Sequence, residues 1–281
     1  MKNEELFSQI SKFLKEGKTV AICTIVKKIG SGPRDVGTKL ILTDAGDQIG
    51  TIGGGAFERL LLDKVKEALK NRKPKYLVFS LYGDKVYSKG AIKTGLICGG
   101  ELHVFVDIVE PNPKMVIIGS GHIAKPVYDI ANMLGFEITV ADDNATTLTE
   151  ERFPNAKRIY NENFEEALKQ LDIRQDTFVV IVHGEPNHDR AALNRVIPTD
   201  AKYIGFLSSK AKAVTLFKEL KEKGVPIEKI RSIYTPIGLD IGATTPEEIA
   251  VSIMSEIVKI MRGGTGNHSR DVYKLAEKLK S

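Results

Sequence analysis

The second half of the chain alternates short apolar runs with amphipathic segments, and this alternation constrains the fold more than any other feature. The runs MVIIG, ITVAD and FVVIV are each followed by a stretch with helical spacing. Short apolar strands that alternate with helices predict a parallel sheet covered on both faces. Residues 114–262 are therefore expected to form an α/β domain with a Rossmann-like, doubly wound parallel sheet.

Residues 1–110 follow a different pattern, which predicts an α+β domain. An amphipathic helix that stops at Gly17 precedes a buried strand, a hairpin turning at residues 44–47, a second helix over 56–70 and further strands. Because the prolines of VEPNPK interrupt helices and central strands, the boundary between the domains is expected at 109–114. Residues 263–281 are expected to form a flexible joint and a C-terminal helix.

Composition excludes several classes of protein. The 281 residues are 42% hydrophobic and 27% charged, as in globular domains. No run approaches the roughly 18 apolar residues of a membrane span, and the start MKNEELFSQI lacks a signal core. Two cysteines without a disulfide pattern suit a reducing cytoplasm. The net charge of +5 is dispersed among acids, so neither a membrane nor a nucleic-acid partner is expected.

A glycine-rich motif opens the first helix of the second domain. Gly119 and Gly121 fit G-x-G-x-x-G/A after an apolar strand, and the next strand ends in Asp142 and Asp143. This context predicts a dinucleotide site, with the pyrophosphate at the helix start and a carboxylate at 142 or 143 on the ribose. His122 would add affinity for an anion. A Rossmann-type scaffold that binds no nucleotide remains the alternative.

A second candidate anion site precedes the helix over 56–70. Gly53, Gly54 and Gly55 could aim successive amides at one anion, with the helix dipole adding to the field. The alternative is a turn with positive φ, which would need one or two glycines but hardly three. Arg34, in the preceding loop, could grip a phosphate or carboxylate, or could be an ordinary surface arginine.

Cys98 lies in GLICGG, where Gly99 and Gly100 leave the backbone bare. Because glycines have no side chains, a ligand could approach the thiol closely. A thiolate is also a soft donor that binds metals. The alternative is a buried thiol acting as a small hydrophobe, as we expect for Cys23. Because no CxxC or HxxxH spacing occurs, no dedicated zinc site is expected.

Two histidines follow the third apolar run of the second domain. His183 comes directly after the strand, and His188 begins the next helix. Strand ends of this kind bind ligands in open α/β sheets. The favoured alternative is a helix-capping loop with histidines in solvent.

Taken together, the motifs resemble the XdhC/CoxI family. The resemblance rests on GSGPRDVGTKLIL, IGTIGGGAFE, GLICGGELHVFVDIV, VIIGSGHIAKPV, TVADDN, YIGFLSSKAK and GLDIGATTPEEIAVSIMSEIV, which follow the family's order over residues 18–262. Two loops depart from the family's usual motifs. Ser208 and Lys210 replace glycine and arginine, and GEPN separates His183 from His188.

The resemblance implies an accessory factor for molybdenum hydroxylases such as xanthine dehydrogenase. Such a factor binds the molybdenum cofactor (molybdopterin), supports its sulfuration by a cysteine desulfurase and delivers it to the apo-hydroxylase. By resemblance, Cys98 of the Cys-Gly-Gly motif would hold the cofactor and contact molybdenum, and the glycine triad with Arg34 could hold its phosphate. A homodimer would enclose such cargo, although no residue pattern indicates one.

A cofactor chaperone is thus favoured over a catalyst, and no catalytic residue is assigned. The alternative is an NAD(P)-dependent oxidoreductase, or a protein holding another dinucleotide, that uses Gly119, Gly121 and Asp142. Either His183 or His188 would then have to supply its proton.

Overall fold

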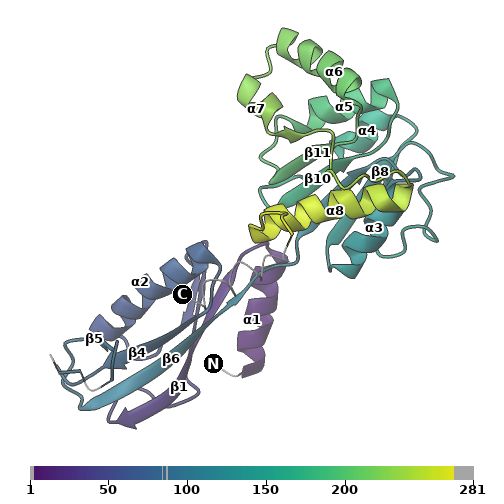
Figure 1. Cartoon of the computed structure of the whole chain (residues 1–281). Helices are drawn as coiled ribbons and strands as arrows, with labels where there is room; N and C mark the ends of the chain where they lie inside the picture. The colour runs from purple at the N-terminus through teal and green to yellow at the C-terminus, as the bar shows by residue number, and fades with distance from the viewer. Residues whose placement is uncertain (1–2, 84, 87, 269–281) are drawn as a thin grey trace, which may run out of the picture. The chain divides into compact units, whose positions relative to one another are not determined.

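The computed structural model describes residues 3–83, 85, 86 and 88–268. The chain divides into two compact units, Met1–Asn112 and Pro113–Ser281, each with its own sheet (Figure 1). The division falls inside the proline-containing segment 109–114. The C-terminal helix expected after residue 268 lies outside the described residues.

The N-terminal unit is an α+β domain built on a mixed sheet. Its strand order is β3-β2-β1-β6-β4-β5. The strands are β1 (Val20–Gly30), β2 (Lys39–Thr43), β3 (Gln48–Gly50), β4 (Lys75–Ser80), β5 (Ile92–Lys93) and β6 (Gly100–Val109). The central pair, β1 and β6, is antiparallel, and β2 and β3 form the expected hairpin around residues 44–47.

Two helices cover this sheet, α1 (Asn3–Lys15) and α2 (Gly55–Asn71). Because side chains alternate along a strand, neighbouring residues of β2 join different cores. Ile41 packs in the cluster of α1, whereas Leu40 and Leu42 pack in the cluster of α2. The cluster with α2 also contains Cys23, as the sequence predicted.

The C-terminal unit is the expected Rossmann-like domain. Its strands are parallel in the order β12-β11-β10-β7-β8-β9. They are β7 (Lys114–Ile118), β8 (Glu137–Asp142), β9 (Lys157–Tyr160), β10 (Thr177–Ile181), β11 (Tyr203–Phe206) and β12 (Ile233–Tyr234). This is the 3-2-1-4-5-6 order of dinucleotide-binding folds, in which the strand order, not the strand direction, reverses between β7 and β10.

Helices cover both faces of this sheet (Figure 1). They are α3 (Ala124–Met133), α4 (Phe164–Lys169), α5 (Pro186–Val196), α6 (Lys210–Glu222), α7 (Ile227–Arg231) and α8 (Pro246–Arg262). Met115 and Ile117 of β7 pack with α3 and α8, whereas Val116 and Ile118 pack with α4, α5 and α6. The all-apolar runs noted in the sequence thus reflect strands buried on both sides.

The last helix shows how local sequence sets a helix's bounds. At the start of α8, the Thr245 side chain accepts from the Glu248 amide and the Glu248 carboxylate accepts from the Thr245 amide. Gly263 ends the helix in the left-handed conformation. No helix in the described part of the chain is both long and apolar enough to cross a membrane.

Replacing Phe57 tests the core of the N-terminal unit. Phe57 is fully buried and meets Phe79 edge-to-face at 5.0 Å between ring centroids. Phe57→Ala should lower the unfolding free energy of this unit by about 3–5 kcal/mol because it leaves a cavity. Urea unfolding measures the loss. Phe105→Ala, at a 39% exposed position on β6, is the matched control and should cost less; equal losses would contradict this account of the core.

Candidate functional site

Glycines bring the Cys98 loop against the loop that follows β1. A Cβ at Gly100 would lie 1.8 Å from the carbonyl oxygen of Ser31, and one at Gly30 would lie 2.5 Å from that of Gly99. The Ser31 amide also donates to the Gly99 oxygen at 3.4 Å. The bare backbone around Cys98 is therefore needed, at least in part, for two loops to touch.

The loop that carries Arg34 also contacts the glycine triad. A Cβ at Gly53 would lie 2.7 Å from Cγ of Pro33, the residue before Arg34. Arg34 itself is exposed. Three segments that the sequence singled out, 31–34, 53–55 and 98–100, thus meet at one end of the sheet in the N-terminal unit.

The two cysteines have opposite environments. Cys98 is a free, exposed thiol next to Ile97, whose exposed fraction is 89%. The alternative that Cys98 is a buried small hydrophobe is wrong. Cys23 is buried in the core, where burial raises the pKa of its thiol to about 12. The accessible thiol is therefore Cys98.

The three glycines before α2 all have positive φ, at 143°, 67° and 63° for Gly53, Gly54 and Gly55. The expectation that a turn here would need no more than two glycines is wrong, because backbone conformation alone accounts for all three. No atom lies within 4 Å of a Cβ built at Gly54 or Gly55, so the outer side of the turn is open.

The protein's own Glu58 carboxylate occupies part of the predicted anion site. One oxygen of its carboxylate accepts from the amides of Ile52 at 3.1 Å and Gly54 at 3.0 Å, and from the hydroxyl of Thr51. Burial opposes the charged form, but these hydrogen bonds outweigh it and lower the pKa of Glu58. An incoming anion would have to use the amides that begin α2, from Gly55 onward, or displace this carboxylate.

The second group of candidate residues lies at the carboxyl edge of the Rossmann-like sheet. The Asp142 carboxylate accepts from the amide and hydroxyl of Ser120 through Oδ2, the hydroxyl at 2.7 Å. Its Oδ1 accepts from the amides of Asp143 at 2.8 Å and Asn144 at 3.1 Å. Burial alone would raise its pKa, but hydrogen bonding, including that of His183, lowers it strongly.

This arrangement bears on the ribose contact expected at 142 or 143. Asp142 is 3% exposed and both of its oxygens already have protein donors. The Asp143 side chain is 25% exposed and so is the more accessible of the two carboxylates.

The start of α3 keeps the features that an anion site needs. The amides of Gly121, His122 and Ile123 donate to no other described residue, and His122 is exposed. Arg152, which the sequence did not single out, donates to the carbonyl oxygens of Gly121 at 3.3 Å and Thr147 at 3.1 Å. Because Arg152 lies some thirty residues after the motif, no local sequence pattern indicated its contact with the glycine-rich loop.

His183 and His188 are not solvent histidines, and that interpretation is wrong. Their side chains are 16% and 24% exposed, and their rings stack at 4.1 Å between centroids with an angle of 7°. His188 Nε2 lies 2.7 Å from Oδ2 of Asp143, and its Nδ1 contacts Glu185. Burial alone would lower the pKa of His183, but Asp142 and Asp143 outweigh it and raise that pKa.

The loop that carries these histidines is held by a buried ion pair. Asp189 is fully buried, accepts from the Gly184 amide at 3.2 Å and pairs with Lys212. Lys212 also donates to the Gly184 carbonyl oxygen at 2.8 Å. The segment between His183 and His188, which departs from the family motif, is therefore firmly anchored.

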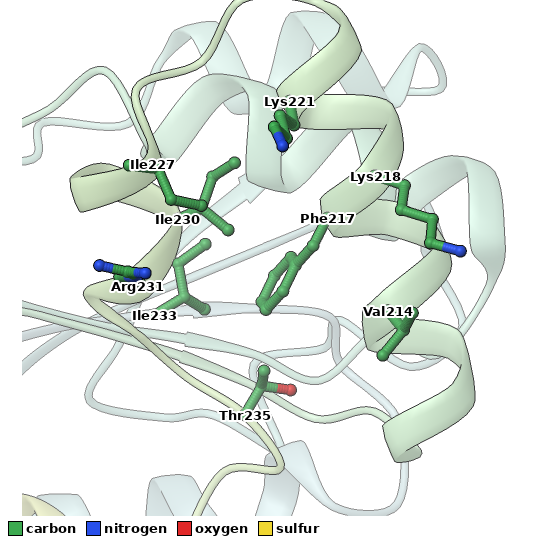
Figure 2. A pocket seen from close by; sticks show the side chains of 9 residues that line it. All are labelled: Val214, Phe217, Lys218, Lys221, Ile227, Ile230, Arg231, Ile233 and Thr235. Atoms are coloured by element: carbon green, nitrogen blue, oxygen red, sulfur yellow. The ribbon is translucent and has the colours of Figure 1, made fainter.

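A separate hollow of about 390 Å³ lies between α6, α7 and β12 (Figure 2). Its lining combines apolar side chains with three cations, and includes Phe217, Ile230, Ile233, Lys218, Lys221 and Arg231. None of the residues singled out in the sequence lines it.

The fold and the glycine-rich edge define a two-domain protein with a Rossmann-type second domain, and comparison with known sequences gives its family. Residues 115–257 match the XdhC Rossmann domain, and residues 13–80 match the XdhC and CoxI family. The chain belongs to the XdhC/CoxI family, as its motifs predicted.

The proteins similar to the chain include two curated relatives and a solved structure. The uncharacterized protein YqeB of Escherichia coli (strain K12) is 36% identical over 262 residues, which are 93% of this chain and 47% of YqeB. A probable xanthine dehydrogenase subunit of Bacillus subtilis (strain 168) is 30% identical over 56% of this chain and 46% of its own length. The chain thus spans about half the length of these relatives.

The solved structure is a xanthine dehydrogenase crystal structure from Bacillus halodurans. It covers 97% of this chain and 99% of its own, with a TM-score of 0.50 and 22% identity. At that identity the likeness concerns the fold alone.

Gly100→Ala tests the contact between the Cys98 loop and Ser31. Because its Cβ would overlap the Ser31 carbonyl, the variant should lose about 1–3 kcal/mol of unfolding free energy in the N-terminal unit. Urea unfolding followed by circular dichroism measures it. Gly121→Ala is the control, since no atom lies within 4 Å of its Cβ position and its φ is not positive. A Gly100→Ala variant as stable as wild type would show that the loops need no such approach.

Asp142→Asn tests how the glycine-rich loop is held. The amide nitrogen that replaces one oxygen cannot accept hydrogen bonds. The free energy needed to open the glycine-rich loop should therefore fall by about 1–3 kcal/mol. Amide hydrogen exchange at Ser120 and Asn144 should speed up accordingly. Asp129→Asn, at a half-exposed carboxylate paired with Lys125, is the control and should leave both rates unchanged.

Proposed function

We propose that this protein is an accessory factor that binds the molybdenum cofactor and delivers it to a molybdenum hydroxylase such as xanthine dehydrogenase. Membership of the XdhC/CoxI family and the similarity to the Bacillus subtilis protein support this role. The observation that carries it is the exposed thiol of Cys98 in a glycine-rich loop that touches the Arg34 segment.

The residues at this site fit the cofactor. Molybdopterin is a bulky pterin dithiolene that carries a phosphate and presents molybdenum to a soft donor. Cys98 supplies an accessible sulfur. No atom lies within 4 Å of a Cβ position at Gly95 or Gly99, so a large ligand has room on both sides of the thiol.

The phosphate would be held by the neighbouring segments. Arg34 offers a guanidinium in solvent. The start of α2, from Gly55 onward, offers amides and a helix dipole beside an open turn. Glu58 already accepts from the amides of Ile52 and Gly54, so the proposed phosphate site uses the amides at the helix start.

Sulfuration of the bound cofactor by a cysteine desulfurase and transfer to the apo-hydroxylase complete the proposed role. Both partners would have to reach Cys98, and its exposure is compatible with this. We place the protein in the cytoplasm, where both partners would work on the reduced cofactor. A homodimer that encloses the cargo belongs to the same proposal.

A second candidate function is that of an NAD(P)-dependent oxidoreductase. It is favoured by the unpartnered amides of residues 121–123, the exposed His122 and the accessible carboxylate of Asp143 at the edge of a Rossmann-type sheet. Gly119, Gly121 and Asp142 would then build the dinucleotide site, with Asp142 acting through the loop that it holds.

Anaerobic titration of the full chain with molybdenum cofactor distinguishes the two functions. Wild type should bind one equivalent, and Cys98→Ser should abolish binding because the sulfur donor is lost. Arg34→Ala should weaken affinity by about 10- to 100-fold if the guanidinium holds the phosphate.

Cys23→Ala is the matched control, since it removes the other thiol from the core and should leave cofactor affinity unchanged. The same protein is titrated with NAD and NADP. If the protein does not bind the molybdenum cofactor but binds NAD or NADP tightly, the accessory role is rejected and the oxidoreductase is favoured.

A further inference from the structure

Three side chains distant in the sequence meet at the carboxyl edge of the Rossmann-like sheet. Asp143 follows β8, His183 follows β10 and His188 lies in the first turn of α5. One ligand atom from each lies within 4.8 Å of the others, and all three residues are partly buried. Since His188 and Asp143 are 45 residues apart, no local spacing motif could reveal the cluster.

The Asp143 carboxylate lies between the two imidazoles. Its Oδ2 is 2.7 Å from His188 Nε2, and its Oδ1 is 3.8 Å from His183 Nε2. The other nitrogen of His188, Nδ1, contacts the Glu185 carboxylate. A histidine whose far nitrogen is bound by a carboxylate is the usual arrangement of a metal ligand, because the carboxylate orients the ring and makes it more basic.

His183 is held much less firmly. Its Nδ1 is buried without a hydrogen-bond partner, and its Nε2 comes no closer than 3.6 Å to Asp142. A buried polar atom left unpaired in this way needs an explanation, and an ion is one of the accepted ones.

The stacking of the two histidine rings shows that one ring would have to move for both to bind the same ion. Ring-nitrogen lone pairs lie in the ring plane, so two rings only 7° from parallel do not aim at one point. One ring must turn for both to bind the same ion. His188 is hydrogen-bonded at both nitrogens, whereas His183 has only longer contacts, of 3.6 Å and 3.8 Å, from Nε2 to carboxylates and no hydrogen-bond partner at Nδ1 among the described residues. His183 is therefore the ring that can turn more easily.

The surrounding charge also favours a cation. Asp142, Asp143 and Glu185 bring three carboxylates to the cluster, and within the described residues no lysine or arginine forms an ion pair with them. The nearby Lys212 is already paired with the buried Asp189. Partly buried negative charge of this kind is stabilised by a bound cation.

We propose that Asp143, His183 and His188 bind a divalent first-row transition metal ion of the Zn²⁺ type, with Glu185 orienting His188. Two imidazoles and one carboxylate suit Zn²⁺ and its neighbours, whereas Mg²⁺ and Ca²⁺ prefer oxygen ligands alone. Three protein ligands leave a coordination position open, as in sites where a metal binds water or a ligand oxygen.

This site belongs to the C-terminal unit and lies beside the glycine-rich loop. A Cβ at Gly119 would lie 2.8 Å from Cα of His183, so the loop and the histidine are in direct contact. The open position of the metal would therefore serve an oxygen-bearing ligand, such as a phosphate, bound at the same edge of the sheet.

The test uses the full chain, stripped of metal with a chelator and titrated with Zn²⁺ against a chromophoric competitor. Wild type should bind one equivalent at this site. Asp143→Asn and His183→Asn should each lower affinity by at least about 100-fold, and Glu185→Gln by about 10- to 100-fold. Circular dichroism of each metal-free variant verifies that it is folded, and three separate positions guard against one variant that fails to fold.

Two variants control for zinc held elsewhere. His268→Asn removes an exposed histidine and Cys98→Ser removes the exposed thiol, and neither should change the affinity of this site. Substitution with Co²⁺ should give visible d–d absorption without a sulfur-to-cobalt charge-transfer band. Binding that survives Asp143→Asn and His183→Asn, or that disappears with Cys98→Ser, would overturn the proposal.

Discussion

The Asp142 carboxylate joins the ends of two neighbouring strands, and the loops at the carboxyl edge of the Rossmann-like sheet depend on it. It accepts from Ser120 after β7 and from the two residues that follow it after β8. Because these donors are backbone amides and a buried hydroxyl, the glycine-rich loop is held in one conformation before any ligand arrives. The next three amides, 121–123, donate to no acceptor among the described residues.

The N-terminal unit achieves preorganisation in a different way. There the loops approach through backbone contact, since glycines at 30, 53 and 100 leave no side chain between neighbouring segments. Glu58 then holds two amides of the turn before α2. Each unit thus uses an internal carboxylate to hold an amide-rich turn, Glu58 at the start of α2 and Asp142 at the glycine-rich loop.

The fold was largely predictable because the signals that define it are local. Strands buried on both faces appear in the sequence as apolar runs, and Gly17 indicated the end of α1. The sequence missed β9 and α7, which span only Lys157–Tyr160 and Ile227–Arg231 and contribute few buried side chains. The alternative of a buried Cys98 and that of histidines in solvent were wrong, because exposure depends on which loops meet. Arg152 and the Asp143 cluster likewise depend on contacts between distant segments and left no pattern in the sequence. Glu58 makes local contacts with residues 51–54, which the sequence analysis did not recognise.

The contact between Gly119 and His183 changes what the glycine fingerprint means in this fold. Glycine at 119 has a φ of 110° and its missing side chain makes room for the backbone of the neighbouring strand's loop. A chain with this architecture would need glycine at position 119 even if it bound no nucleotide. The first glycine of the motif therefore reports on how closely two loops of the scaffold pack, and evidence for a ligand has to come from the groups around the crevice.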